Sequence, residues 1–166
     1  MRKQGRGRQQ DIKRDFEQKV VEIKRVTRVT GGGKRMRFRA LVVIGDKRGK
    51  VGMGVRKGPD VTEAVNKAVN SAKKNMVLVN LINDTIPHEI KIKYKSSVVF
   101  LKPARPGTGV IAGGSVRQVL DLVGVKNVLS KMLGSNNKIN NVRATYLALT
   151  KMKARNVMPK AEKGEK

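Results

Sequence analysis

The most enzyme-like stretch of the chain is the glycine-rich segment Gly107–Ser115, which reads Gly-Thr-Gly-Val-Ile-Ala-Gly-Gly-Ser. A glycine-rich loop that leads into a helix can hold a phosphate group on its backbone N–H groups. A P-loop, however, requires lysine where this chain has Gly114. A dinucleotide-binding loop requires a preceding strand, where this chain has the proline-rich segment 103–106. We interpret the segment as a tight turn or a macromolecular contact, with a phosphotransferase site as the alternative.

A second candidate site consists of basic residues around three consecutive glycines, Gly31–Gly33. Six of them lie on the two strands predicted here and on the turn between them: Arg25, Arg28, Lys34, Arg35, Arg37 and Arg39. Residues 16–58 contain thirteen lysine and arginine residues but only three carboxylates, so the charges are not balanced locally. A turn without side chains can enter a groove too narrow for ordinary backbone. The pattern indicates a phosphate-contacting surface, with a solvated polar sheet face as the alternative.

The composition of the whole chain favours a polyanionic partner. Its 166 residues include 38 lysine and arginine residues against 12 aspartate and glutamate residues, a formal net charge of +26. Self-repulsion of this size is costly unless a polyanion neutralises it. Aromatic residues make up only 3% of the chain, which argues against base-stacking platforms and favours recognition of phosphate and helix shape. No apolar run approaches the ~18–20 residues of a membrane span.

The residue types that usually carry catalysis or hold metals are almost absent. The chain has no cysteine and one histidine, His88, which excludes disulfides, thiolate zinc sites and histidine clusters. The acidic residues are scattered. The pair Asp60 and Glu63 has helical spacing, but helix capping and the helix dipole explain it. We therefore predict no enzyme, no catalytic residues, no metal and no cofactor.

The first half of the chain reads as three strands and a helix. Strands are expected over Val20–Thr30, Met36–Ile44 and Lys50–Arg56, with Gly52 and Gly54 on a face that something approaches closely. A helix is expected after Gly58-Pro59-Asp60, with one apolar stripe: Val61, Ala64, Val65, Ala68, Val69, Ala72 and Met76. Residues 80–87 read as a linker.

The second half reads as a second small α+β unit. Short strands are expected over Ile90–Tyr94 and Ser97–Leu101. Ser115 is expected to cap a helix that Gly124 ends, and Asn140 is expected to cap a last helix. The segment Val125–Leu133 fits either a strand or a helix.

Several collinear motifs resemble the bacterial-type family of ribosomal protein five of the small subunit. The matching stretches are Val26–Phe38, Ala40–Asp46, Gly49–Gly54, Ala68–Met76, Pro103-Ala104, Gly107–Gly114 and Val142–Thr145. The resemblance covers roughly residues 16–150 and does not cover the tails.

The resemblance implies an α+β fold of two small domains. The first is a double-stranded-RNA-binding-like domain, with a three-stranded antiparallel sheet plus a helix and a leading helix to which Asp11–Val20 contributes. The second is a β-β-α-β-α domain of the type found as the second domain of this family. The expected division is a basic N-terminal arm (1–15), a first domain (16–79), a linker (80–87), a second domain (88–153) and a basic tail (154–166).

The resemblance also implies a role. The chain would be a structural constituent of the small ribosomal subunit that binds rRNA, supports assembly and contributes to decoding accuracy and the messenger entry side. Its location would be cytoplasmic, on the ribosome, with an organellar ribosome as the alternative. Its protein neighbours would be small-subunit ribosomal proteins four and eight. In this family the loop matching Thr30–Lys34 reaches rRNA near the spectinomycin site.

The charge pattern and the resemblance together give the expected site residues. The residues expected to bind rRNA are Arg25, Arg28, Gly31, Gly32, Gly33, Lys34, Arg35, Arg37, Arg39, Lys50, Arg56 and Lys57. Gly107, Thr108 and Arg117 are expected to face ribosomal protein four. A free-standing RNA or DNA chaperone is the alternative within nucleic-acid binding, and a phosphotransferase is the alternative outside it.

Overall fold

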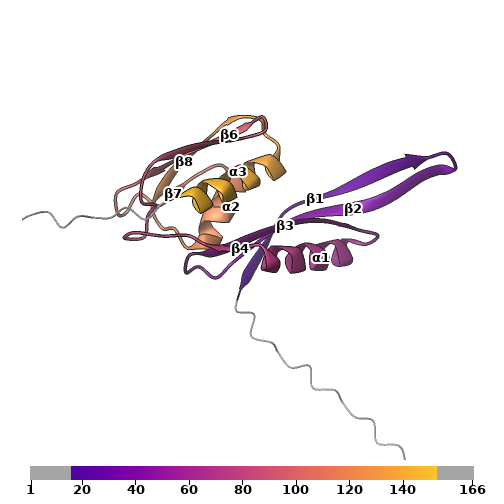
Figure 1. Cartoon of the computed structure of the whole chain (residues 1–166), viewed down its shortest axis with the longest axis horizontal. Helices are drawn as coiled ribbons and strands as arrows, with labels where there is room; N and C mark the ends of the chain where they lie inside the picture. Colours follow the sequence, from indigo (N-terminus) through magenta and orange to yellow (C-terminus); the bar gives the residue numbers. More distant parts are fainter. Residues whose placement is uncertain (1–15, 153–166) are drawn as a thin grey trace, which may run out of the picture.

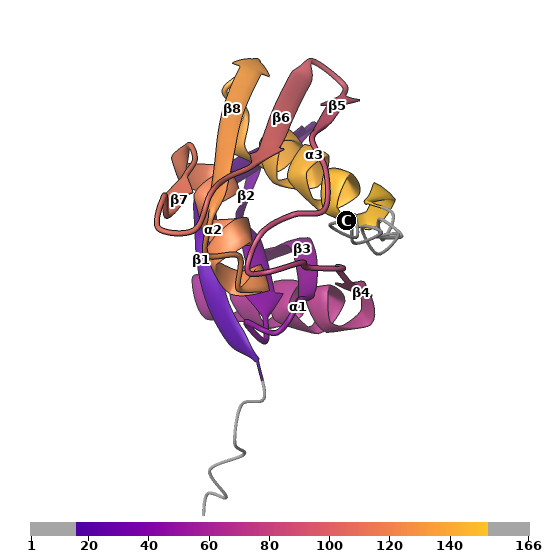
Figure 2. The same ribbon diagram turned by 90° about the vertical axis from the view of Figure 1, so that its left-hand side faces the viewer.

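The computed structural model describes residues 16–152, which form two sheets with helices packed around and between them (Figure 1). The first sheet has the strand order β1-β2-β3-β4, and the second has the order β5-β6-β8-β7. Helix α1 covers the outer face of the first sheet, and helices α2 and α3 lie between the two sheets (Figure 1 and Figure 2). The expected α+β class, with two units of sheet and helix, is confirmed.

The first sheet is antiparallel throughout. Its strands are β1 (Glu17–Thr30), β2 (Gly33–Gly45), β3 (Lys50–Gly58) and β4 (Met76–Leu78). Strands β1 and β2 are the longest, and their far ends extend past β3 as a two-stranded projection with no helix behind it (Figure 1). The sequence predicted three strands in this sheet, and the structure adds a fourth, because β4 pairs with the start of β3.

Helix α1 (Val61–Lys74) packs closely on the first sheet because the sheet presents glycines to it. The side chain of Asp60 caps the helix by accepting from the N–H of Thr62. A Cβ at Gly54 would overlap the carbonyl oxygen of Ala68, and one at Gly52 would overlap that of Ala72. The expected close approach at these two glycines is confirmed, and the approaching element is the backbone of α1.

The second sheet contains β5 (Ile90–Tyr94), β6 (Ser97–Pro103), β7 (Val110–Ile111) and β8 (Val128–Gly134). Strand β7 pairs parallel to β8, whereas the other pairs are antiparallel. Helices α2 (Gly114–Val123) and α3 (Lys138–Lys151) cover its inner face. The ambiguous segment Val125–Leu133 thus resolves mainly into a strand.

One hydrophobic core joins the two halves. Leu41, Val43 and Val51, from the inner face of the first sheet, belong to the same buried cluster as Val116 of α2 and Leu149 of α3. A smaller cluster fills the space between the outer face and α1. The middle of β2 is therefore buried on both faces, which explains why Ala40–Ile44 is continuously apolar and does not alternate.

Polar contacts fix the junction between the halves. The β2–β3 turn donates to the last carbonyl groups of α2, with Lys47 N–H to Leu122 O at 3.0 Å and Gly49 N–H to Val123 O at 2.9 Å. Lys19 of β1 forms a part-buried ion pair with Asp121 at 3.3 Å. The two backbone bonds satisfy carbonyl groups that a helix end otherwise leaves without partners.

Three local predictions are wrong. Residues Glu17–Val20 lie in β1, so they do not contribute to a leading helix, and residues 11–15 fall outside the described part of the chain. Helix α2 begins after Gly113, so Ser115 lies inside the first turn, where its hydroxyl faces the sulfur of Met132. Helix α3 is capped by Asn137, whose side chain accepts from the N–H of Ile139, and Asn140 lies within the helix.

Candidate nucleic-acid interface

The projecting ends of β1 and β2, residues 25–38, carry most of the predicted site, and we call this segment the distal hairpin. Its chain reverses at Gly31 and Gly32, and the hydroxyl of Thr30 donates to the carbonyl of Gly33 at 3.0 Å. Gly33 has a φ of +133°, a conformation suited to glycine. A Cβ atom added at Gly31 or Gly32 would have no neighbouring atom within 4 Å. Crowding by the described part of the chain therefore does not require glycine at these two positions.

The strand register divides the basic residues between two faces. Because cross-strand partners point the same way, the pairs Arg28–Arg35 and Val26–Arg37 share one face, which Arg39 and Lys57 continue. The opposite face carries Arg25, Lys34 and Arg56. The hairpin therefore presents positive charge on both sides, and the first face is the more strongly charged of the two.

The first face forms a shallow groove. It is lined by Val26, Thr27, Arg28, Thr30, Arg35, Arg37 and Lys57. No carboxylate occurs between residues 23 and 45, so the groove has no local counter-charge. Guanidinium groups without a local counter-charge are suitable donors for phosphate oxygens.

Arg39 differs from the other predicted arginines because it already has a partner. Glu22, whose side chain is only 11% exposed, lies 3.8 Å from Arg39, 3.4 Å from Lys24 and 3.8 Å from Lys138 of α3. Among the basic residues predicted to bind rRNA, Arg39 is the one that forms an ion pair within residues 16–152. It therefore connects the hairpin to the second half as well as extending the basic face.

The structure does not bring every predicted residue together. Lys50 lies at the start of β3, beside Leu78 of β4, whereas Lys57 lies at the other end of β3 beside Arg39. Arg56 faces a separate pocket between the two halves. Lys50 is thus remote from the distal hairpin.

In the glycine-rich segment 107–115, the amides of Gly107 and Gly109 are already bonded within the chain. The side-chain oxygen of the buried Asn127 accepts from the N–H groups of Gly107 at 3.0 Å and Gly109 at 3.1 Å. Both glycines have positive φ, +90° and +75°. The described residues also contain no cluster of three or more histidine or acidic side chains that could hold a metal ion. Sequence analysis missed Asn127, since no local pattern marks it.

Gly107, Thr108 and Arg117 are all exposed. The loop that contains Gly107 and Thr108 precedes β7, and Arg117 lies in the first turn of α2. The neighbouring exposed apolar side chains are Ile111 and Leu129 on the paired strands β7 and β8. The surface is exposed and combines polar, charged and apolar side chains, which is compatible with a protein contact.

The ionisable groups with shifted pKa values lie outside the distal hairpin. A hydrogen bond from Lys47 lowers the pKa of Glu17. A hydrogen bond from Arg143 lowers the pKa of Tyr94, and burial raises the pKa of Tyr146. None of the helices within residues 16–152 is long and apolar enough to cross a membrane.

Comparison with known proteins gives matches over both halves. The family model of the ribosomal protein S5 N-terminal domain matches residues 16–80, and that of the ribosomal protein S5 C-terminal domain matches residues 92–162. The small ribosomal subunit protein uS5c of Spinacia oleracea is 50% identical over 149 residues, which is 89% of this chain and 48% of that protein. The chain therefore spans about half the length of this curated relative.

Proposed function

This chain belongs to the ribosomal protein S5 family, and from that membership we propose that it is a structural, non-enzymatic constituent of the small ribosomal subunit that binds rRNA through its distal hairpin. The observation that carries the proposal is the basic face of the hairpin, where Arg28, Arg35 and Arg37 have no ion-pair partner among residues 16–152. Arginines that are free of internal carboxylates can bind phosphate without first breaking an ion pair.

Shape supports the same proposal. The hairpin projects from a body that is rigidified by the shared core, and its tip carries only glycine (Figure 1). A double-stranded RNA presents a deep, narrow groove that ordinary side chains do not read. A two-stranded projection with a bare tip and arginines along both edges can follow the phosphates that border such a groove.

The finer roles are proposals that rest on the family. We propose that Gly107, Thr108 and Arg117 contact ribosomal protein four at an interface that contributes to decoding accuracy. We also propose that the second domain packs on ribosomal protein eight and that the hairpin side contributes to the messenger entry side. We also propose the division into domains at residues 16–79 and 88–153, joined by the linker 80–87. The two family matches, which leave residues 81–91 uncovered, support that division. The location proposed is the ribosome, in the cytoplasm or in an organelle.

The test of the hairpin proposal replaces its three free arginines together. The variant Arg28→Gln/Arg35→Gln/Arg37→Gln should bind small-subunit rRNA more weakly, because three phosphate contacts are lost. The slope of log affinity against log salt should fall by about 2–3, since each phosphate contributes ~0.7–0.9. Affinity is measured by filter binding over a salt series with the full chain.

A control variant with the same change in net charge tests whether the position of the removed charges matters. The variant Lys91→Gln/Lys93→Gln/Lys102→Gln removes three positive charges from exposed positions of the second sheet. It should keep a salt slope close to that of the unaltered chain. Equal slopes for the two triple variants would show that binding depends on overall charge and not on the hairpin.

A further inference from the structure

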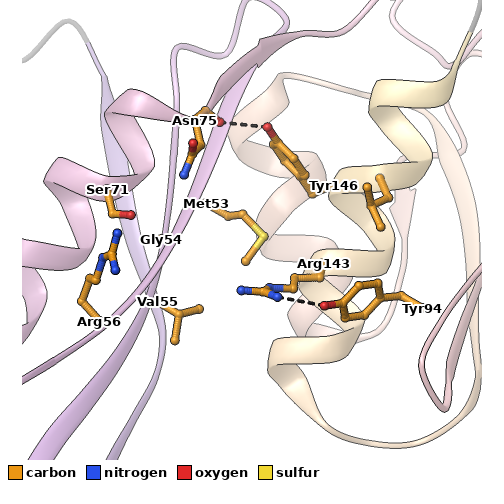
Figure 3. A pocket seen from close by; sticks show the side chains of 10 residues that line it. Met53, Gly54, Val55, Arg56, Ser71, Asn75, Tyr94, Arg143 and Tyr146 are labelled. Carbon is orange, nitrogen blue, oxygen red and sulfur yellow. Dashed lines mark hydrogen bonds between the residues drawn. The ribbon is translucent and has the colours of Figure 1, made fainter.

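A pocket of about 420 Å³ opens between the two halves, away from the distal hairpin. It lies where β3 continues past the short strand β4, so that one edge of β3 has no partner strand among residues 16–152. Figure 3 shows the side chains that line it. Its walls come from β3, the end of α1, β5 and α3, through Met53, Gly54, Val55, Arg56, Ser71, Asn75, Tyr94, Arg143, Tyr146 and Leu147. The volume is within the range of pockets that hold a small organic ligand, roughly 300–1,000 Å³.

Both tyrosines of the chain line this one pocket. The hydroxyl of Tyr146 donates to the carbonyl of Asn75 at 2.9 Å and so spans from α3 to the end of α1. The hydroxyl of Tyr94 accepts from Arg143 at 2.8 Å, and the guanidinium carbon of Arg143 lies 5.8 Å from the centre of the Tyr94 ring. These bonds hold two aromatic rings and one guanidinium group in fixed positions around the opening.

The pocket is also positively charged. Arg56 on β3 and Arg143 on α3 are exposed and lie on opposite walls, and no carboxylate lines the space between them. Neither arginine forms an ion pair within the described part of the chain. The side chains of Met53, Val55 and Leu147 add an apolar surface, and Ser71 and Asn75 supply polar groups.

This combination fits a nucleotide better than a bare anion or an apolar ligand. Proteins hold unstacked RNA bases by stacking them on aromatic rings and arginine planes, while basic groups take the phosphate and polar groups bond the base edges. We propose that the pocket binds one unstacked nucleotide of single-stranded RNA, with the base against the two tyrosines and the phosphate between Arg56 and Arg143. The proposal extends the RNA binding proposed above to a second site that does not depend on the distal hairpin.

Ligand binding in the pocket can be followed by the fluorescence of its tyrosines. Because the chain has no tryptophan and both tyrosines lie in the pocket, intrinsic tyrosine fluorescence reports directly on it. Titration of the full chain with a uridine pentaribonucleotide should quench this fluorescence to saturation. The variant Arg143→Gln should bind the pentamer about tenfold more weakly, because a hydrogen bond from a charged donor is lost. The variant Arg48→Gln, altered at an exposed arginine of the β2–β3 turn, should bind as the unaltered chain does.

Comparison ligands decide between the alternatives. A pentameric sugar-phosphate chain without bases should quench little, and pentaglutamate should not compete. Equal binding of the baseless chain would overturn the proposal in favour of a simple anion site. Competition by pentaglutamate would overturn it in favour of an acidic peptide on the free edge of β3.

A measurement without any variant keeps the test independent of folding. Photo-crosslinking of a 4-thiouridine pentamer to the full chain should give adducts on Tyr94 or Tyr146, identified by mass spectrometry. Adducts confined to residues 25–38 would overturn the pocket while leaving the hairpin proposal intact. Conversely, the triple hairpin variant should lose rRNA affinity and keep its tyrosine quenching by the pentamer, so the two proposals fail separately.

Discussion

The chain has two glycine-rich segments, and they differ in what their backbones are bonded to. At the tip of the distal hairpin, the N–H groups of Gly31 and Gly32 donate to no described residue. In the segment that begins at Gly107, the side chain of Asn127 accepts from the N–H groups of Gly107 and Gly109. The loop glycines of the more phosphate-like sequence are thus bonded internally, while those of the hairpin turn are left open.

The difference shows what a glycine motif does and does not indicate. Glycine permits close approach and positive φ, but it does not decide whether the approaching group is a ligand or another part of the same chain. At Gly107 and Gly109 the partner is internal, and at Gly54 it is helix α1. At Gly31 and Gly32 no partner lies within residues 16–152, and the surrounding arginines make phosphate the expected one.

The largest effect on stability is expected at Asn127. The substitution Asn127→Ala leaves the N–H groups of Gly107 and Gly109 without their acceptor, so the free energy of unfolding should fall by about 1–3 kcal/mol. Urea denaturation of the full chain measures the change. Asn136→Ala, at an exposed position in the loop before α3, serves as the control. Unchanged stability of Asn127→Ala would mean that the loop amides are free, and the contrast between the two glycine segments would disappear.

A smaller effect is expected at Gly113. A Cβ there would meet the terminal methyl of Met132, which is the far end of a flexible side chain and can rotate away. Gly113→Ala should therefore lower the free energy of unfolding by less than about 1 kcal/mol, the range typical of tolerated substitutions. The matched change Gly54→Ala places a Cβ against the carbonyl oxygen of Ala68, so it should lower the free energy of unfolding distinctly more. If Gly113→Ala and Gly54→Ala lower the stability equally in thermal denaturation, the flexibility of Met132 does not explain a difference between the two sites.

The smallest effect on stability, with a separate effect on function, is expected at Gly32. Gly32→Val adds a side chain into open space, so the free energy of unfolding should change by no more than about 0.5 kcal/mol. The added bulk should nevertheless hinder entry of the tip into RNA and disturb small-subunit assembly or the response to spectinomycin. Sucrose-gradient profiles and growth on the drug measure this. A normal profile and drug response would show that the tip needs no close contact.

The sequence predicted the elements of the fold better than their packing. Strands and helices follow local patterns, such as the stripe of alanine and valine residues on α1 and the glycine that ends α2. The union of the two halves through α2 and α3 depends on residues far apart in the chain. One signal could have indicated it, because the unbroken apolar run Ala40–Ile44 is typical of a strand buried on both faces.

The candidate sites show the same limit. The unbalanced arginines around Gly31–Gly33 were visible as a charge pattern, and they lie together on the distal hairpin. The separation of Lys50 from that group, and the ion pair of Arg39 with Glu22, depend on register and on tertiary contacts. The pocket with Tyr94, Arg143 and Tyr146 brings together residues from both halves, so no local motif could reveal it.

The shared core also has a consequence for the order of events during synthesis. Residues 16–79 emerge before the second half, but the inner face of their sheet, with Leu41, Val43 and Val51, packs against α2 and α3. Since translation proceeds from the N-terminus, part of this apolar face stays exposed until α3 has been made. The hairpin gains its rigid base only once α3 has been made. Nascent chains that stop in the linker are accordingly expected to be substrates for chaperones before they become ligands for RNA.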